Sequence, residues 1–500
     1  MERFEADQGH HRRVRRVIAS RSFAAIAALL ALVATPGIAH AQATTPAKSA
    51  KKSARRLHVD GYVRQYYFTK QQASNTAAAG VKSLPQNQAA TNTGILVRAT
   101  YDLTSHFSAT AGYYGVDAFN ANGPCSHAPN YAIGGACTPA MQAQIDNTLP
   151  GFGLSTLGEA YLRYHTDKVN IAVGNQKLNT PWAQPIDGRM KPNFFQGLSS
   201  NFEFAPNLSL TVDRIVRFES RTSSSFLPTT FVTKPTQFVP GALYTALAYS
   251  GKHRPVTGMI GLYNFYNIAN LVDAEGRTAL GSKSRFAPYL QAQYIRERNA
   301  GLSYAGLVDN STLGFAIGAT AAKNVTFSYA IDDAPWRSTT VTAASLAAAT
   351  ASHVFLPTGG SPAIKANGNG TYTLYYGGIA SPYTGAYAGD GLFTSIPTAS
   401  MAQRQSAGAS SKATINYHSN NRRLQTQLAF AQFNFTNGAG VEKSHASLLQ
   451  ATYYFGKPKG KSFDGFSIED RYIERTQTNV AQFGGVPLLI YNRLQLQYSF

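Results

Sequence analysis

Two opposite charges lie two positions apart in the segment 177–197, which interrupts the alternating pattern of the strands around it. Asp187 and Arg189 would present a carboxylate and a guanidinium from one loop. In a narrow passage of low dielectric constant, such a pair orients a dipolar or carboxylate solute. A second interpretation is equally open, in which the two side chains pair with each other or with the surrounding wall and hold the loop in place.

Four arginines on predicted strands extend this binding chemistry. Arg98 and Arg163 alternate with apolar neighbours, so each should lie on the polar face of its strand. Arg64 and Arg217 are assigned less directly, because the alternation of their strands slips in phase. An arginine that faces lipid at the midplane of a membrane costs about 2–4 kcal/mol, which favours an interior position for all four. The alternative for each is a position near the lipid headgroups.

The sequence evidence for a catalytic motif is weaker than the evidence for this binding chemistry. The stretch Gly456-Lys-Pro-Lys-Gly-Lys-Ser462 imitates a phosphate-binding loop, but it is one residue short and no helix is predicted after it. No Gly-x-Ser-x-Gly elbow occurs. A hydrolase would still need a serine or an acid pair beside a histidine, and His106, His165 and His418 keep that alternative open.

Cysteine and histidine usage argues against a metal centre. Cys125 and Cys137 are the only cysteines, and they fall in a stretch rich in Gly, Pro, Asn and Ala. A local disulfide between them is expected in an oxidising compartment. The 11 His are dispersed along the chain, so we expect no metal and no other cofactor.

The first 41 residues have the features of a secretory leader, here a predicted signal peptide over 1–41. Arginines precede an apolar stretch at 23–34, and Ala39-His-Ala41 is a small-residue cleavage site. An uncleaved anchor is the weaker alternative, because a membrane-spanning helix needs about 20 apolar residues. The segment 42–56 is small, polar and basic, and we interpret it as a periplasmic tail ahead of a domain over 57–500.

The chain without this leader keeps a large positive charge. It holds 39 basic and 22 acidic residues, a net charge of +17. Such an excess either lines a pore and concentrates anions, or lies on loops and binds anionic outer-leaflet lipid. Nucleic acid is disfavoured as a partner, because the basic residues are scattered and an exported chain rarely meets it.

The elements that must position these side chains are alternating strands. The chain ends in the strand 491–500, whose Leu494, Leu496, Tyr498 and Phe500 share one face. This apolar-out, polar-in pattern is typical of the strand that closes a transmembrane barrel. We expect Tyr498 and Phe500 to be the membrane-insertion signal that the barrel-assembly machinery recognises.

The same pattern repeats as two strands joined by a short turn and followed by a longer loop. Strands are predicted at 57–68, 94–103, 106–116, 156–165, 168–176, 197–204, 208–217, 240–249, 256–265, 285–296, 300–308, 312–320, 324–331, 404–418, 422–435, 445–456, 463–475 and 489–500. Their number, about 18, is even, as an antiparallel barrel with both termini in the periplasm requires. The predicted fold class is therefore all-β, a transmembrane antiparallel β-barrel. Two long loops, 117–155 and 332–403, are expected to face outward, with a short helix at 343–349 as one option.

The loop with the charge pair and the strands before it resemble one known family. Leu157-Gly-Glu-Ala-Tyr-Leu-Arg-Tyr164 leads to Val173-Gly-Asn-Gln176, then to a Thr-Pro, to Asp187-Gly-Arg-Met-Lys-Pro192 and to Gly197. This order of motifs is similar to that of the OprD family of substrate-specific outer-membrane channels. The stretch 61–68 and the Tyr-Ser-Phe end also look similar, so the resemblance extends over the whole mature chain.

The resemblance implies a monomer-like barrel, passive diffusion of small solutes, and a constriction of inward-folded loops opposite a row of lumenal arginines. The family's arginine positions have no matching motif here. The expected function is an outer-membrane porin, and not an enzyme, for anionic or zwitterionic nutrients such as carboxylates and amino acids. Expected partners are outer-membrane lipid, the barrel-assembly machinery and small solutes. The alternatives are a barrel-embedded hydrolase and a closed structural or adhesive barrel.

Overall fold

The computed structural model describes residues 56–72, 86–117, 153–187, 189–221, 223–228, 239–251, 256–280, 286–304, 306–351, 364–379, 394–397, 399–401, 407–437, 440–456, 458–459, 462–478 and 487–500. All of them belong to one compact unit, Arg56–Phe500. The predicted leader, the predicted tail up to residue 55, and Cys125 and Cys137 with their predicted disulfide lie outside the described residues.

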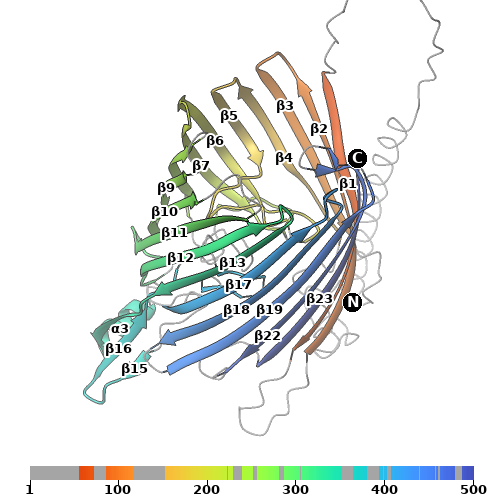
Figure 1. Cartoon of the computed structure of the whole chain (residues 1–500). Coiled ribbons are helices and arrows are strands. Elements are labelled where there is room, and N and C mark those ends of the chain that lie inside the picture. Colours follow the sequence, from red (N-terminus) through yellow and green to blue (C-terminus); the bar gives the residue numbers. More distant parts are fainter. Residues whose placement is uncertain are drawn as a thin grey trace, which may run out of the picture. The chain divides into compact units, whose positions relative to one another are not determined.

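Eighteen antiparallel strands form one closed sheet, shown in Figure 1. In chain order they are β1 (Leu57–Gln72), β2 (Gln86–Asp102), β3 (Phe107–Asp117), β4 (Leu154–His165), β5 (Val169–Gln176), β6 (Phe194–Ala205), β7 (Leu208–Glu219), β8 (Ala242–Ser250), β9 (Val256–Phe265), β10 (Ala269–Ala279), β11 (Phe286–Asn299), β12 (Asp309–Ala321), β13 (Val325–Ala334), β17 (Ala407–His418), β18 (Leu424–Asn437), β19 (Gly440–Tyr454), β22 (Gly465–Gln477) and β23 (Leu488–Ser499). Each strand pairs with the next, and β1 pairs with β23, Tyr62 lying opposite Ser499. Closure leaves no open sheet edge, so the predicted barrel and its strand number are confirmed.

One predicted strand is wrong. The described residues of this segment, 300–304 and 306–308, form no strand, and Gly301, Ser303 and Gly306 have φ between 53° and 78°. Extended strands require negative φ, so this segment cannot join the sheet.

The strand that takes its place in the count is β10, which the sequence pattern did not predict. It follows β9 after a turn around Asn267, whose φ is 60°. Asp273, Glu275 and Arg277 make the segment resemble a loop, but they alternate and share the inner face. The sequence pattern predicted a short turn and a longer loop in alternation along the chain. Two connections expected to be long loops are short instead: β10 begins four residues after the end of β9, and only two residues separate β18 from β19.

Alternation separates an outer from an inner face on each strand. On β1, Val59 and Tyr67 are 40% and 48% exposed, whereas Tyr62, Arg64 and Tyr66 between them are buried. An exposed apolar outer face belongs in lipid, and the inner face lines the lumen.

The segment between β13 and β17 carries further small elements, drawn in teal in Figure 1. They are β14 (Arg337–Thr342), α3 (Ala343–Ala351), β15 (Ile364–Ala366) and β16 (Thr371–Tyr376), and the three strands form one sheet. The helix covers the stretch 343–349 named as helical from the sequence. A two-strand ribbon, β20 (Pro458–Lys459) with β21 (Ser462–Phe463), precedes β22. Among the described residues, no helix combines the length and the apolar character that a membrane span needs.

Candidate functional site

The loop between β5 and β6, residues 177–193, folds into the barrel and contacts opposite parts of its wall. The backbone N–H of Trp182 donates a hydrogen bond of 3.1 Å to Tyr263 Oη on β9. On the other side, Arg64 of β1 donates one of 2.8 Å to Asp187 Oδ1. Since β1 and β9 lie about half a circumference apart in the closed sheet, the loop crosses the lumen. The predicted inward-folded loop is confirmed.

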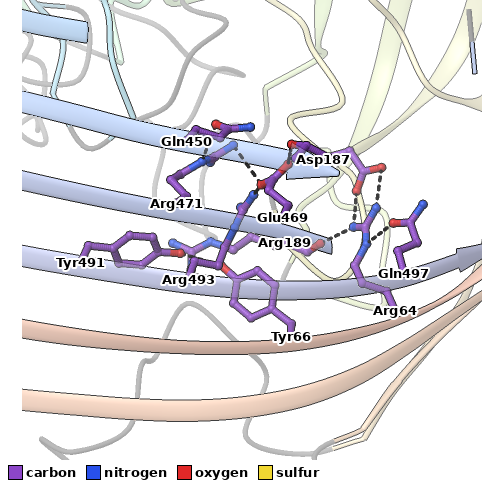
Figure 2. A network of polar contacts seen from close by, with 11 residues as sticks. Arg64, Tyr66, Asp187, Arg189, Gln450, Glu469, Arg471, Tyr491, Arg493 and Gln497 are labelled. Atoms are coloured by element: carbon purple, nitrogen blue, oxygen red, sulfur yellow. Dashed lines mark hydrogen bonds and ion pairs between the residues drawn. The ribbon is translucent and has the colours of Figure 1, made fainter. Parts of the chain in front are cut away.

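Arg64 holds the tip of this loop, as Figure 2 shows. Its Nη1 donates to Asp187 Oδ1 and, at 2.5 Å, to the carbonyl oxygen of Arg189, while its Nε donates to Gln497 Oε1 at 2.9 Å. Burial by itself would raise the pKa of Asp187, but the adjacent Arg64 guanidinium holds that pKa below its ordinary value of 3.8. Asp187 is therefore ionised at neutral pH and pairs with the wall.

A buried ion pair anchors the end of the same loop. Lys191 Nζ lies 2.7 Å from Glu219 Oε1 of β7, and both side chains are 0% exposed. Lys191 also donates to the carbonyl oxygen of Ser220, and Thr156 donates to the second oxygen of Glu219. Burial lowers the pKa of Lys191 to about 8, and the Glu219 carboxylate opposes this shift. Lys191 thus depends on Glu219 for its charge.

Part of the long segment between β13 and β17 also enters the lumen. Thr394 Oγ1 donates to Asp332 Oδ2 at 2.8 Å, and Lys412 Nζ of β17 donates to the carbonyl oxygen of Ser395 at 2.8 Å. Ile396 is 2% exposed. Two inward segments therefore narrow the passage from different sides.

Between these segments and the wall strands β17 to β23 lies a cavity of about 350 Å³. Its charged lining residues are one acid, Asp187, and five bases, Arg189, Arg221, Lys412, Arg471 and Arg493. The rest of the lining is partly apolar, with Ile186, Ile396, Leu448 and Ile473. Such a cavity suits an anion with an apolar body, because the bases offer charge-assisted hydrogen bonds and the apolar wall excludes water.

The arginines of the wall are held by neighbours in a network that Figure 2 shows. Arg471 Nε donates to Gln450 Oε1 at 2.9 Å. Glu469 accepts a hydrogen bond from Arg493 and lies 3.5 Å from Arg471. One carboxylate thus serves two guanidinium groups, and this part of the wall keeps a positive charge.

The structure places the residues singled out from the sequence in different parts of the barrel. Asp187, Arg189 and Arg64 come together at the cavity. Arg98 points into the lumen but pairs there with Asp60 at 2.5 Å and lies 3.5 Å from Glu159.

Arg163 also lies on the inner face, far from the loop. It lies two residues before the end of β4, with its guanidinium 5.2 Å from the centre of the Tyr161 ring. It is therefore not part of the cavity.

Arg217 departs from the predicted lumenal position. The pairing of β6 with β7 shifts register at Gln196 and Gly197, which leaves Val216 as an extra residue. Arg217 is exposed, and its neighbour Phe218 packs inside against Phe195 at 5.4 Å. Successive residues of a strand face opposite sides, so Arg217 faces outward near the loop end of β7. Its outward position matches the alternative given above, a place near the lipid headgroups.

Sequence reasoning did not select the other cavity bases, Arg221, Lys412, Arg471 and Arg493. Arg493 could have been found, since it alternates with Leu494 as Arg98 does with Val97. Arg471 lies between Asp470 and Tyr472, so β22 lacks the apolar alternation that would have marked its inner face.

Two of the histidines named for a hydrolase, His106 and His418, contact backbone carbonyl oxygens. His106 Nδ1 lies 3.1 Å from the carbonyl oxygen of His165, and His418 Nδ1 lies 3.2 Å from that of Ser419. Within the described part of the chain, no group of three or more His, Cys, Asp or Glu residues is placed to hold a metal ion.

The Asp187–Arg64 pair makes the loop sensitive to acid. A carboxyl whose pKa is lowered in the folded protein stabilises it fully above the ordinary pKa, and this contribution is lost as the pH falls below about 4. We expect single-channel current noise to increase as the pH falls below about 4, and Asp187→Asn to show this noise already at neutral pH. Equal acid sensitivity in the variant would exclude Asp187 as the titrating group.

Several solved structures of porins share this fold. OpdK from Pseudomonas aeruginosa, solved with vanillate, has a TM-score of 0.61 at 13% identity, covering 89% of this chain and 98% of that one. A BenF-like porin from Pseudomonas fluorescens Pf-5 has a TM-score of 0.63 at 12% identity, with the same coverage. OpdG from Pseudomonas aeruginosa gives 0.62 at 13%, again with the same coverage. No protein-family model matches the sequence, and no curated protein matches it.

Proposed function

We propose that this protein is an outer-membrane porin that lets small carboxylates diffuse passively through its lumen. Support for a channel comes from the closed barrel, its apolar outer face and its likeness in fold to porins. An 18-stranded barrel has an aqueous interior unless loops fill it. Here the loop 177–193 and the segment 394–397 narrow that interior to a charged passage.

The observation that carries the substrate class is the charge of the cavity lining. Five basic side chains and one acidic side chain surround it, and the acidic one is already paired with Arg64. An anion entering this space meets a positive potential in a confined, poorly screened volume. A carboxylate binds guanidinium groups through two parallel hydrogen bonds, which also sets its orientation.

The apolar part of the lining favours carboxylates that carry a hydrocarbon or aromatic body. The side chains of Ile186, Leu448 and Ile473 lie in the same cavity as the bases. Vanillate, the molecule bound to OpdK, is an aromatic carboxylate of this kind. Amino acids form a second class, because the Asp187 carboxylate is paired with Arg64 but remains 39% exposed, so it can also accept a hydrogen bond from an ammonium group.

Planar-bilayer recordings test the porin and its preference together. In a salt gradient we expect a reversal potential of anion-selective sign. Liposome swelling should be faster with benzoate than with the similarly sized cation benzylammonium. Folded protein that gives no ion-permeable events would exclude the channel and favour a closed barrel.

A further inference from the structure

Three arginines gather on the outer face of the barrel near the end of β11. Arg296 of β11 pairs with Ser311 of β12, and Arg298 pairs with Asp309. Directly paired residues point to the same side of a sheet. Leu313, two residues after Ser311, is 48% exposed on the apolar outer surface. Since residues two apart share a face, all four polar side chains point outward.

The third arginine, Arg337, comes from β14. Its Nη2 donates a hydrogen bond of 3.0 Å to Ser311 Oγ, so its guanidinium lies beside the Arg296–Ser311 pair. Arg296 itself forms an ion pair with Asp309. Arg298 is exposed, and neither it nor Arg337 forms an ion pair with a described residue. Three guanidinium groups thus share one carboxylate. We name Arg296, Arg298 and Arg337 the rim arginines.

A second acid lies nearby. Asp333 of β13 pairs with Leu313, and it is exposed on the same face. The three rim arginines against Asp309 and Asp333 leave one positive charge in excess at this part of the surface. An anion is therefore the favoured neighbour of the rim arginines.

The rim arginines lie at the extracellular end of the barrel. β11 ends at Asn299 and β12 begins at Asp309, on the same side as the connection from β13 to β17. Long connections of outer-membrane barrels are extracellular. Tyr294, two residues before Arg296, is 43% exposed and marks the membrane interface as girdle aromatics do. The rim arginines therefore lie among the head groups of the outer leaflet.

An apolar hollow of about 550 Å³ lies deeper in the membrane on the same strands. Its floor holds two small paired residues, Gly276 of β10 and Ala292 of β11. Leu290, Phe315 and Ile317 stand around it and are 43–56% exposed. A Cβ atom added at Gly276 would meet no other atom within 4 Å, so the space above this glycine is open.

The spacing between the rim arginines and the hollow fits one lipid molecule. Ala292 and Leu290 lie four and six residues before Arg296. A strand rises about 3.3 Å per residue, so these positions are about 13–20 Å away along β11. With a tilt of about 45°, they lie about 9–14 Å deeper, within the outer half of a hydrocarbon core about 30 Å thick. An acyl chain whose head group lies at the rim arginines therefore reaches the hollow.

We propose that the rim arginines and the apolar hollow form a binding site for one lipid A-type glycolipid of the outer leaflet. The phosphate groups on its sugars bind Arg298 and Arg337, and one of its acyl chains fills the hollow above Gly276. Guanidinium groups bind phosphate through paired, charge-assisted hydrogen bonds. Phospholipids of the inner leaflet place their head groups at the opposite end, so they cannot occupy both parts. The inference goes beyond the porin function and holds whatever solute the lumen passes.

Native mass spectrometry of the barrel released from detergent tests the head-group contacts, with purified bisphosphorylated lipid A as the probe. We expect a one-to-one adduct with the wild-type chain. Arg298→Gln combined with Arg337→Gln should weaken its binding about tenfold or more, because charged hydrogen bonds are lost while the Arg296 ion pair stays intact.

The matched control removes two exposed bases elsewhere on the extracellular rim. Arg217→Gln combined with Lys443→Gln should bind lipid A like the wild type. Equal losses in the two double variants would show attraction to the overall charge alone and would overturn the proposal. So would a wild-type chain without an adduct, or equal binding of lipid A and its dephosphorylated form.

A further variant tests the hollow. Gly276→Leu fills it without a steric clash and should weaken lipid A binding about tenfold, because the acyl chain loses burial equivalent to about two methylene groups. Ala413→Leu, on the exposed outer face of β17, is the control and should bind like the wild type. Undiminished binding in Gly276→Leu would refute the site. All variants should keep the wild-type conductance, which shows a folded barrel and separates this test from the porin test.

Discussion

Glu219→Gln is expected to release the lumenal loop and to lower the stability of its docking by about 3–5 kcal/mol, as for other buried pairs that lose one partner. The variant leaves Lys191 buried without an opposite charge. Lys191 is 0% exposed and cannot reach water without moving the loop. We therefore expect a larger and noisier single-channel conductance and faster proteolysis within 177–193.

The matched control removes both charges together. Replacing a buried ion pair by uncharged side chains of similar size is often neutral, because the cost of burying the charges disappears with them. Lys191→Met combined with Glu219→Gln should therefore restore the quiet, wild-type conductance. A double variant as noisy as Glu219→Gln would show that the loop is held mainly elsewhere, for example through Arg64.

The second large effect is expected at the wall of the cavity. Combining Arg471→Gln with Lys412→Met removes two of its five bases without touching the Arg64–Asp187 pair. A hydrogen bond to a charged group contributes about 1.5–3 kcal/mol, so benzoate should block the channel about 100-fold less strongly or worse. The reversal potential should shift towards cations. Both effects are measurable on single channels.

Two other arginines serve as controls for this prediction. Arg217→Gln removes a charge from the outer face and should leave selectivity unchanged. Arg98→Gln removes a lumenal charge that Asp60 and Glu159 already balance, so its effect should be small. A selectivity change at Arg98 equal to that at Arg471 and Lys412 would favour a route along β2 instead of the cavity. Unchanged selectivity in the cavity variant would contradict the proposed site.

Most of the strands could be predicted because a barrel strand leaves a local trace. In β23, Leu494 and Leu496 face lipid and are each followed by a glutamine that faces the lumen, so four or five residues are enough to detect the pattern. β10 leaves a weaker trace, because its outer residues include Ala274 and Gly276, which are hardly more apolar than a loop. For Arg217, alternation predicted the wrong side because a single extra residue at Val216 reverses the facing of the residues after it.

The alternation was determined by the sequence itself, and with it the barrel and the inner face that carries Arg64 and Arg98. Only the tertiary structure decided which residues line the cavity. Arg64, Asp187, Lys412 and Arg493 are separated by up to several hundred residues, and they meet because β1 closes on β23 while two segments fold inward. Alternation is a property of neighbouring residues, whereas the distance between a loop and the far wall depends on the register of every strand between them.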